Sequence, residues 1–253
     1  MRECSAILRN VDLSIPIMGP GQLRLLRGSL IKSAVGGNLD RQNGKVHVQA
    51  LRDISFELRQ GEHLGLVGHN GAGKTTLLKV IAGIYPPSNG EVVVEGSIGC
   101  MFDIEAGISQ EMTGYESIKF QHMIYGDGEV PLQALTEEIA SFTELGNYLE
   151  LPLRTYSAGM RARLMAALAT AWRRDILLID EGIGAGDQTF QEKFQKRIDS
   201  LLESAGLLVV ASHSGDLLRQ YCARGIVLER GQVQMSGTID EALDFYESLT
   251  ERA

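Results

Sequence analysis

The chain has 253 residues, 44% of them hydrophobic and 22% charged, with a net charge of −8 at pH 7. This length suits one α/β domain, with or without a small insertion, and the composition is that of an ordinary soluble globular protein. The acidic balance argues against a nucleic-acid partner, so we expect none. No apolar run approaches the ~18 residues of a membrane span. Cys4, Cys100 and Cys222 lack metal-ligand spacing, which indicates reduced thiols.

The beginning of the chain predicts two strands separated by a long loop. The strands are expected over residues 6–13 and 46–58, where apolar residues alternate. Residues 18–45 are rich in Gly, Asn, Arg and Ser, which predicts mostly loop. Within this loop, Leu and basic residues at helical spacing over 22–32 fit a short amphipathic helix at a membrane surface. A surface helix packed on the domain explains the same pattern equally well.

The next segment has the form GxxxxGK[ST], preceded by a strand predicted over 63–67 and followed by a helix from 74 to about 82. Its residues are Gly68, His69, Asn70, Gly71, Ala72, Gly73, Lys74, Thr75 and Thr76. The glycines let consecutive N–H groups turn inward and hold phosphates, and the helix N-terminus faces the same anion. Lys74 can reach the β- and γ-phosphates, and the Thr75 hydroxyl can bind Mg²⁺. The segment therefore predicts a nucleotide site.

Beyond this loop, the pattern predicts a helical insertion in an α/β core. Short strands are expected over 91–94 and 97–102, and the pattern is helical from about 113 to 149. The remaining predicted elements are a strand at 175–180, a helix at 188–203, a strand at 207–211, a hairpin of 225–228 with 232–235, and a helix at 239–249. The apolar strands are typical of a parallel sheet that is buried on both faces.

Polar residues stand at the ends of two of these core strands. The strand at 175–180 ends in Asp180 and is followed by Glu181, and ligands bind at the carboxyl ends of such strands. Asp180 is placed to hold Mg²⁺, and Glu181 to orient and deprotonate an attacking water. The next strand is followed by His213, whose imidazole can donate to a γ-phosphate oxygen at the same sheet edge.

A second anion site is predicted where Ser157 and Gly159 precede a helix expected over 161–172. A helix start with a serine hydroxyl and a small loop binds anions, although a serine also caps ordinary helices. One phosphate loop does not need this second site on its own chain. A phosphate loop and a second anion site on one chain make sense if two copies of the protein face each other, so that the loop of one copy meets the second site of the other.

The ordered set of motifs resembles the nucleotide-binding subunit of ABC transporters over about residues 5–236. The stretch 157–159 looks like the signature motif, usually LSGGQ, and Glu181 looks like the catalytic glutamate. Residues 184–187 look like the loop that follows it, and His213 looks like the switch histidine. The resemblance implies a head-to-tail homodimer that encloses two ATP molecules. Each ATP would lie between Lys74 of one subunit and Ser157 with Gly159 of the other.

A finer resemblance is to exporters of lipid-linked polysaccharides, namely O-antigen, capsule and wall teichoic acid. Three stretches carry it: GIYPPSNG at 83–90, FDIEAG followed by EMTGYE at 102–116, and YSAGM at 156–160. The last two are similar to that group's LELGAGF…ELTGREN and YSSGM. The resemblance implies a partner permease in the membrane, a lipid-linked glycan as cargo, and a place on the cytoplasmic face of the bacterial inner membrane.

Several residues depart from the family pattern. The Gln that usually contacts Mg²⁺ is replaced by Asp103, with Glu105 two residues on. The aromatic residue that usually stacks on adenine is missing, and His47 is the nearest substitute. The resemblance also leads us to expect no C-terminal carbohydrate-binding domain.

The expected fold is an α/β P-loop NTPase core with an antiparallel β subdomain and an inserted helical subdomain. The division places the core in 1–103 and 174–236, the helical subdomain in 104–173 and a last helix in 237–253. The expected activity is ATP hydrolysis that drives export of a lipid-linked polysaccharide. Two alternatives stay open: an ABC subunit for a drug, lipid or ion, and an ABC ATPase that acts outside transport.

Overall fold

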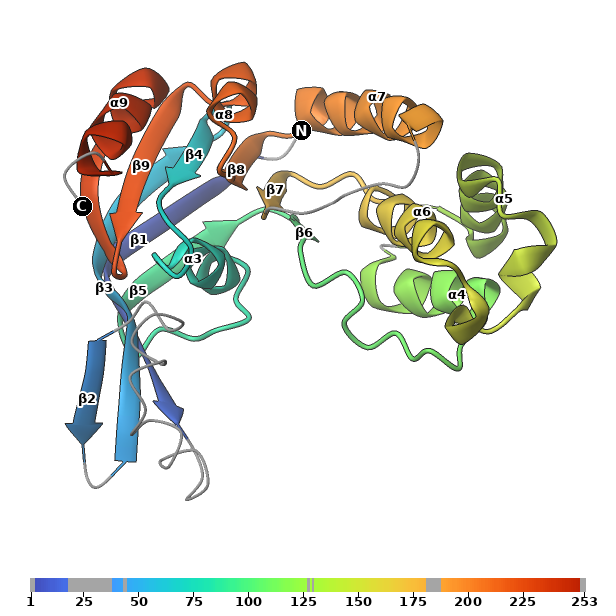
Figure 1. Cartoon of the computed structure of the whole chain (residues 1–253), viewed down its shortest axis with the longest axis horizontal. Helices are drawn as coiled ribbons and strands as arrows, with labels where there is room; N and C mark the ends of the chain where they lie inside the picture. The colour runs from blue at the N-terminus through green and yellow to red at the C-terminus, as the bar shows by residue number, and fades with distance from the viewer. Residues whose placement is uncertain are drawn as a thin grey trace. The chain divides into compact units, whose positions relative to one another are not determined.

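The computed structural model describes residues 3–17, 38–42, 45–126, 128, 130–180 and 188–250. Its contacts divide the chain into two compact units. Unit 1 comprises Met1–Ile98, Asp175–Glu181 and Gly206–Ala253, and unit 2 comprises Gly99–Arg174 and Gly182–Ala205. Elements carry the labels of Figure 1.

Unit 1 contains an antiparallel sheet with the strand order β2-β3-β1-β5. Its strands are β1 (Ser5–Ile17), β2 (Asn38–Gln42), β3 (Lys45–Arg59) and β5 (Asn89–Glu95). The register of β1 against β3 shifts at three points, and two residues there adopt positive φ: Asn10 at the first shift and Asp53 at the second. Such bulges bend a strand and increase its twist.

The second sheet holds the strands that lead to the predicted site, in the order β10-β9-β4-β8-β7-β6. Its strands are β4 (His63–Val67), β6 (Ile98–Met101), β7 (Ile176–Ile179), β8 (Leu207–Ala211), β9 (Arg224–Glu229) and β10 (Gln232–Thr238). Strand β4 pairs in parallel with both β8 and β9, and β8 pairs in parallel with β7. Every residue of β8 is buried, as expected for a central strand of a parallel sheet.

Three described helices belong to unit 1: α3 (Lys74–Ile81), α8 (Gly215–Tyr221) and α9 (Ile239–Thr250). Helix α9 packs on β4 and β9, and buries Ile239, Ala242 and Leu243. Helix α3 contacts β8 of one sheet and β3 and β5 of the other. Helix α3, which buries Leu77, Leu78, Val80 and Ile81, therefore touches strands of both sheets; its place in the chain is shown in Figure 1.

Unit 2 is a helical body with its own core. Its α-helices are α4 (Gly114–Tyr125), α5 (Leu132–Thr143), α6 (Ala158–Ala169) and α7 (Gln188–Ser204), joined by the 3₁₀ turns η1 (Gly146–Glu150) and η2 (Leu153–Thr155). A capping box at Thr113 and Glu116 begins α4, which satisfies two backbone donors reciprocally. The core joins residues of all four helices, including Ile118, Ile139, Leu164 and Phe190.

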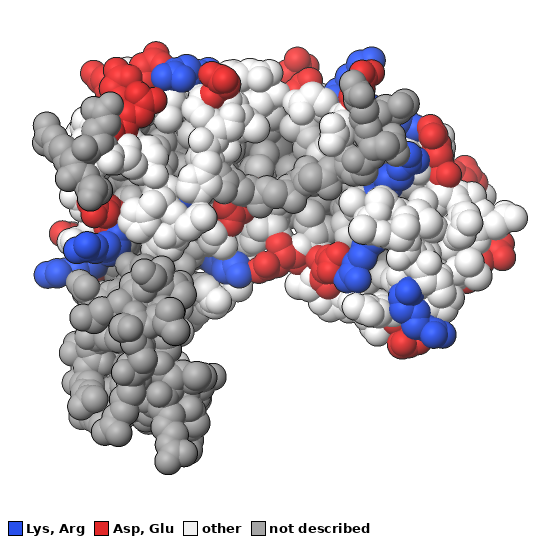
Figure 2. All heavy atoms as spheres, viewed as in Figure 1, with Lys and Arg blue, Asp and Glu red and all other residues white. Residues whose placement is uncertain are grey.

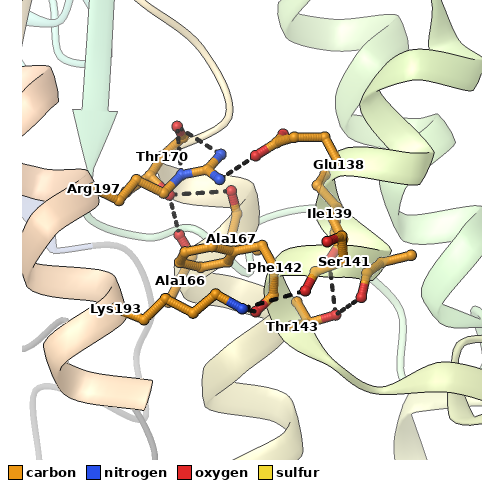
Figure 3. Close-up of polar contacts among 11 residues, drawn as sticks. Glu138, Ile139, Ser141, Phe142, Thr143, Ala166, Ala167, Thr170, Lys193 and Arg197 are labelled. Carbon is orange, nitrogen blue, oxygen red and sulfur yellow. Dashed lines mark hydrogen bonds and ion pairs between the residues drawn. The ribbon is translucent and has the colours of Figure 1, made fainter. Parts of the chain in front are cut away.

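Helix α7 is attached to unit 2 by aromatic and cationic contacts. Phe190 meets Phe142 of α5 edge to face, with 5.2 Å between the ring centroids. The Arg197 guanidinium lies over the same Phe142 ring at 4.5 Å and donates to the Thr170 carbonyl and the Glu138 carboxylate (Figure 3). Lys193 donates to the Phe142 carbonyl and to Glu144, at 3.0 and 2.8 Å. The helix is thus bound to α5 and to the end of α6.

This attachment differs from the sequence-based division, which placed residues 174–236 together in the α/β core. A helix between two parallel strands ordinarily suggests a crossover packed on the sheet. Here Phe190 and Phe194 belong to the helical core, so α7 groups with unit 2. A strand–helix–strand pattern does not reveal which neighbour the helix covers.

Most predicted elements are confirmed, with bounds that shift by a few residues. Strands β4 and β8 have the predicted bounds, and α3 ends one residue early. The prediction of mostly loop over 18–45 missed β2, which pairs with β3 within this segment. The helix predicted over 161–172 instead spans Ala158–Ala169, because Ser157 begins it, and α8 was not predicted. The possible helix over 22–32 lies outside the described residues.

The described part of the chain contains no helix long and apolar enough to cross a membrane. On the face shown in Figure 2, acidic and basic side chains are mixed, with an acidic group near α9. The first turn of α9 contains Asp240 and Glu241. The visible described residues form no basic stripe on this face, in line with the net charge of −8.

Candidate nucleotide-binding site

Three neighbouring strands of unit 1 end at the candidate site. Strand β4 runs into the phosphate loop, β7 is followed by Asp180, and β8 is followed two residues later by His213. Because β8 pairs in parallel with both β4 and β7, these three ends lie at one edge of the sheet. The predicted meeting of the loop, Asp180 and His213 at this edge is confirmed.

Lys74 lies inside the phosphate loop, at the first position of α3. Its side chain is buried, with 7% relative exposure, which is rare for a lysine without partners. The ammonium donates to the carbonyls of Gly68, at 2.5 Å, and His69, at 3.3 Å. The loop therefore folds around a cation held by its own backbone, and an anion that enters the loop meets that cation directly.

Thr75 and Asp180 bring two hard oxygen atoms together. The Thr75 hydroxyl donates to Asp180 Oδ2 at 2.5 Å, although the two residues are 105 positions apart in the sequence. Mg²⁺ typically takes one or two protein oxygens and completes its octahedron with phosphate oxygens and waters. This hydroxyl–carboxylate pair fits that requirement. The described residues hold no cluster of three or more His, Cys, Asp or Glu suited to a metal, so Mg²⁺ here would depend on the nucleotide for further ligands.

His213 contacts the phosphate loop from the adjacent strand. Its Nε2 lies 2.8 Å from Asn70 Oδ1, a hydrogen bond that requires the proton on Nε2. The same nitrogen is 3.4 Å from Lys74 Nζ. An exposed imidazole at this position is next to the side chain expected to hold the terminal phosphates, which places it to sense or contact them.

The start of α3 leaves backbone donors facing the loop. Gly73 is the N-cap residue, with φ of 110°, and no side chain among the described residues caps the helix there. The first N–H groups of a helix have no intrahelical partner, and with the helix dipole they favour a bound anion. The loop glycines, Lys74 and this helix start thus make one positively polarised cradle.

The predicted second anion site lies on unit 2, at the start of α6. Ser157 caps this helix, and its hydroxyl accepts from the Met160 N–H at 3.2 Å. Ser157 and Ala158 are exposed. A Cβ added at Gly159 would have one neighbouring atom within 4 Å, namely Ser157 Oγ at 4.0 Å. The helix start therefore has an open surface, and its part in a nucleotide site stays a prediction.

The loop that contains Asp103 is tied to the same helix. Arg161 of α6 forms a two-pronged ion pair with Glu105, with hydrogen bonds of 2.7 and 2.5 Å. The hydrogen bond from Arg161 to Glu105 raises the pKa of the guanidinium. Asp103 is exposed and adopts a φ of 50° in this loop. Sequence reasoning missed the pair, because no local pattern links residues 56 positions apart.

The remaining predicted site residues divide into two groups. His47 lies in β3, with its Nδ1 3.4 Å from Ser14 Oγ, and its role at adenine stays a prediction. Glu181 and residues 184–187 lie outside the described residues.

All three cysteines are free, and burial raises the pKa of Cys222 to about 12 and that of Cys100 to about 11. These two thiols are therefore protonated at neutral pH.

Comparison with known proteins identifies the family. A family model described as ABC transporter matches residues 51–184. The chain is 44% identical over 230 residues to the O-antigen export system ATP-binding protein RfbE of Yersinia enterocolitica, which covers 90% of this chain and 96% of that protein. It is 39% identical to the capsule polysaccharide export ATP-binding protein CtrD of Neisseria meningitidis serogroup B, covering 79% of this chain and 90% of that protein.

A solved structure agrees on the fold. The dimeric ATP-binding cassette MJ0796, bound to ADP and Pi in a post-hydrolysis state, superposes with a TM-score of 0.67. It is 20% identical in sequence, and the match covers 92% of this chain and 98% of that one. The α/β P-loop NTPase fold expected from the sequence is thereby confirmed. The chain belongs to the ABC transporter family and is an ATP-binding ATPase of that family.

Proposed function

We propose that this protein is the ATP-hydrolysing subunit of an exporter that moves a lipid-linked, O-antigen-like polysaccharide across the inner membrane. The observation that carries the proposal is the 44% identity to RfbE over almost the whole of both chains. Of the three stretches that gave the resemblance to polysaccharide exporters, 83–90 lies in unit 1, and 102–116 and 156–160 lie in unit 2. The identity to RfbE and the resemblance of these stretches to polysaccharide exporters agree, and a cargo other than a polysaccharide would leave that agreement unexplained.

ATP binding is assigned to the phosphate loop. The loop N–H groups and the start of α3 hold the phosphates, and Lys74 exchanges its bonds to the Gly68 and His69 carbonyls for phosphate oxygens. This exchange keeps the ammonium hydrogen bonded in both states, so burial of Lys74 does not oppose binding. Thr75 and Asp180 are the residues that would hold Mg²⁺, which neutralises charge on the phosphates when bound.

Hydrolysis is assigned to groups at the same sheet edge. Glu181 follows Asp180 directly, and in this proposal it takes a proton from the attacking water. His213 donates a hydrogen bond from Nε2 to a terminal phosphate oxygen, and this bond replaces the one that Nε2 makes to Asn70 Oδ1. The reaction is therefore activated by a carboxylate and stabilised by cations and amides that are already oriented.

A second copy of the chain supplies the rest of each site. The exposed helix start at Ser157 and Gly159 offers N–H groups and a hydroxyl to the γ-phosphate of the ATP bound by a partner subunit. The expected assembly is a head-to-tail homodimer with two ATP molecules, coupled to a membrane permease. The protein would then lie on the cytoplasmic face of the inner membrane, held there by that permease.

The shared site is tested by mixing two inactive variants. A subunit with Ser157→Arg keeps its phosphate loop, and a subunit with Lys74→Ala keeps its helix start. A heterodimer of the two has one intact composite site, so each heterodimer should have about half of the ATPase activity of a wild-type dimer, whereas each variant alone is inactive. A random 1:1 mixture, about half of which is heterodimer, should therefore regain about a quarter of the wild-type activity per dimer. A folded, dimeric mixture without phosphate release would contradict the shared site.

The cargo is tested in cells that carry Glu181→Gln. Retained ATP binding without turnover should stop export, and a lipid-linked glycan should build up on the cytoplasmic side, detectable by mass spectrometry of lipid extracts. Glu192→Gln, at an exposed position on α7, is the matched control and should leave export unchanged. Normal glycan levels together with a different accumulated solute would exclude polysaccharide as the cargo while leaving the ATPase assignment intact.

A further inference from the structure

The turn between β9 and β10 is hydrogen bonded to the phosphate loop. The Gly231 N–H donates to the Ala72 carbonyl, and the Gly231 carbonyl accepts from the Arg52 N–H, both at 2.8 Å. One glycine of a β-hairpin thus links β3 to the middle of the phosphate loop. All three segments belong to unit 1.

The geometry of the peptide bond gives this contact a consequence for phosphate binding. The Ala72 carbonyl and the Gly73 N–H belong to the same planar trans peptide, in which the C=O and N–H point in opposite directions. A hydrogen bond that holds the carbonyl toward the turn therefore directs the Gly73 N–H away from the turn. Gly73 is the N-cap of α3, where unpaired N–H groups meet an anion.

Gly231 has no room for a side chain. It adopts a φ of 76°, and a Cβ there would lie 2.3 Å from the Ala50 carbonyl oxygen and 3.1 Å from the Leu51 Cα. These are backbone atoms of β3, so the contact is relieved only if the turn and the strand separate. That separation would break the hydrogen bond from Arg52 of β3 and move the Gly231 N–H relative to the Ala72 carbonyl.

The same hairpin also supports the beginning of the loop. A Cβ at Gly68 would lie 2.4 Å from the Leu228 carbonyl oxygen of β9. The hairpin therefore touches both the first residue of the phosphate loop and Ala72, four positions later. Contacts at two separated points hold the loop backbone more firmly than either contact alone.

We propose that the β9–β10 turn, through Gly231, is a positioning element for the phosphate loop that keeps the Gly73 N–H directed at the nucleotide phosphates. The proposal rests on the nucleotide site described above. Gly231 acts through the Ala72–Gly73 peptide and touches no phosphate. Its loss should therefore weaken phosphate binding while the remaining amides and Lys74 stay in place.

The test compares Gly231→Ala with Gly83→Ala. Gly83 has a similar φ of 71°, but nothing lies within 4 Å of its added Cβ, so it carries the backbone strain without the clash. Loss of one charge-assisted hydrogen bond predicts about 10- to 100-fold weaker ATP binding for Gly231→Ala. The ATP affinity of Gly83→Ala should stay within about 2-fold of the wild-type value, because this variant loses no hydrogen bond to the phosphates. Equal ATP affinities for the two folded variants, measured by calorimetry, would overturn the proposal.

A measurement on the wild-type protein covers the case in which Gly231→Ala does not fold. With ¹⁵N-glycine labelling, the Gly231 amide should exchange slowly with solvent before nucleotide is added, and the Gly73 amide should become protected when Mg-ADP binds. Fast exchange at Gly231, or a Gly73 amide unaffected by Mg-ADP, would overturn the proposal. Lys74→Ala distinguishes failure of the Gly231 proposal from failure of the nucleotide-site assignment. Normal ATP binding by that variant would show that the phosphate loop is not the nucleotide site.

Discussion

Two helix starts in this protein are suited to an anion, and they are built in different ways. The start of α3 has a glycine N-cap and depends on distant segments, because Gly231 holds the Ala72 carbonyl and Asp180 holds Thr75. The start of α6 has a local serine cap and an exposed surface. The first is held in place by hydrogen bonds from other segments of the chain. The second is exposed, which is what the proposed half-site, completed by another copy of the chain, would require.

The start of α3 contains a buried cation, Lys74, and the largest expected effect comes from removing it. Lys74→Ala removes this cation, so ATP hydrolysis should fall about 10³-fold, on the scale of other preorganised electrostatic groups. Phosphate release measures it. Lys79→Ala is the matched control on the same helix, where the ammonium lies 5.8 Å from the Tyr85 ring centroid. A comparable loss in Lys79→Ala would show that the effect comes from α3 as a whole.

The next effect concerns how α6 is anchored at its other end. Arg197 has 17% side-chain exposure and donates to the carbonyl of Thr170, the C-cap residue of α6, while it covers the Phe142 ring. Arg197→Ala should therefore lower the unfolding free energy by about 2–3 kcal/mol, measured by urea denaturation. Arg154→Ala breaks an exposed pair with Glu111 and should cost about 0.5 kcal/mol or less. Equal losses would mean that α7 is not the anchor.

A smaller effect tests whether Ser157 does more than cap its helix. Ser157→Ala and Thr113→Ala each remove an N-cap hydroxyl in unit 2, so each should cost about 1 kcal/mol of stability. Only Ser157→Ala should also reduce ATPase activity at matched folded fractions, because its hydroxyl is proposed to face a partner's ATP. Equal ATPase activities in the two variants would reduce Ser157 to a structural cap.

The smallest effect lies in the ion pair between the 103–107 loop and α6. Glu105 and Arg161 are 49% and 31% exposed, so solvent screens them, and a double-mutant cycle with Glu105→Gln and Arg161→Gln should give about 0.5–1 kcal/mol of coupling. The same cycle run on ATPase activity tests whether the loop orients the start of α6. Additive effects on both measurements would show that the pair is incidental.

Local patterns predicted a large part of the fold because its core elements are strongly periodic. The segment from β4 through α3 was predicted almost to the residue, since an apolar strand, a glycine loop and a helix follow one another. Helix α8 was missed because it is only seven residues long, although Ser214 at its N-cap was a usable signal. Strand β2 was missed because it is a five-residue edge strand with a single apolar residue, in a segment rich in Gly and Asn, and so leaves little periodic pattern.

The sequence by itself determined the chemistry of the site: a phosphate loop with Lys74 and Thr75, a carboxylate at the end of a core strand, and a serine-capped helix start. Only the tertiary structure decided which of these groups touch. It pairs Thr75 with Asp180, His213 with Asn70, and Gly231 with Ala72. The physical reason is that each pairing depends on strand order in the sheet, and strand order follows from packing between segments far apart in the chain, which no local pattern encodes.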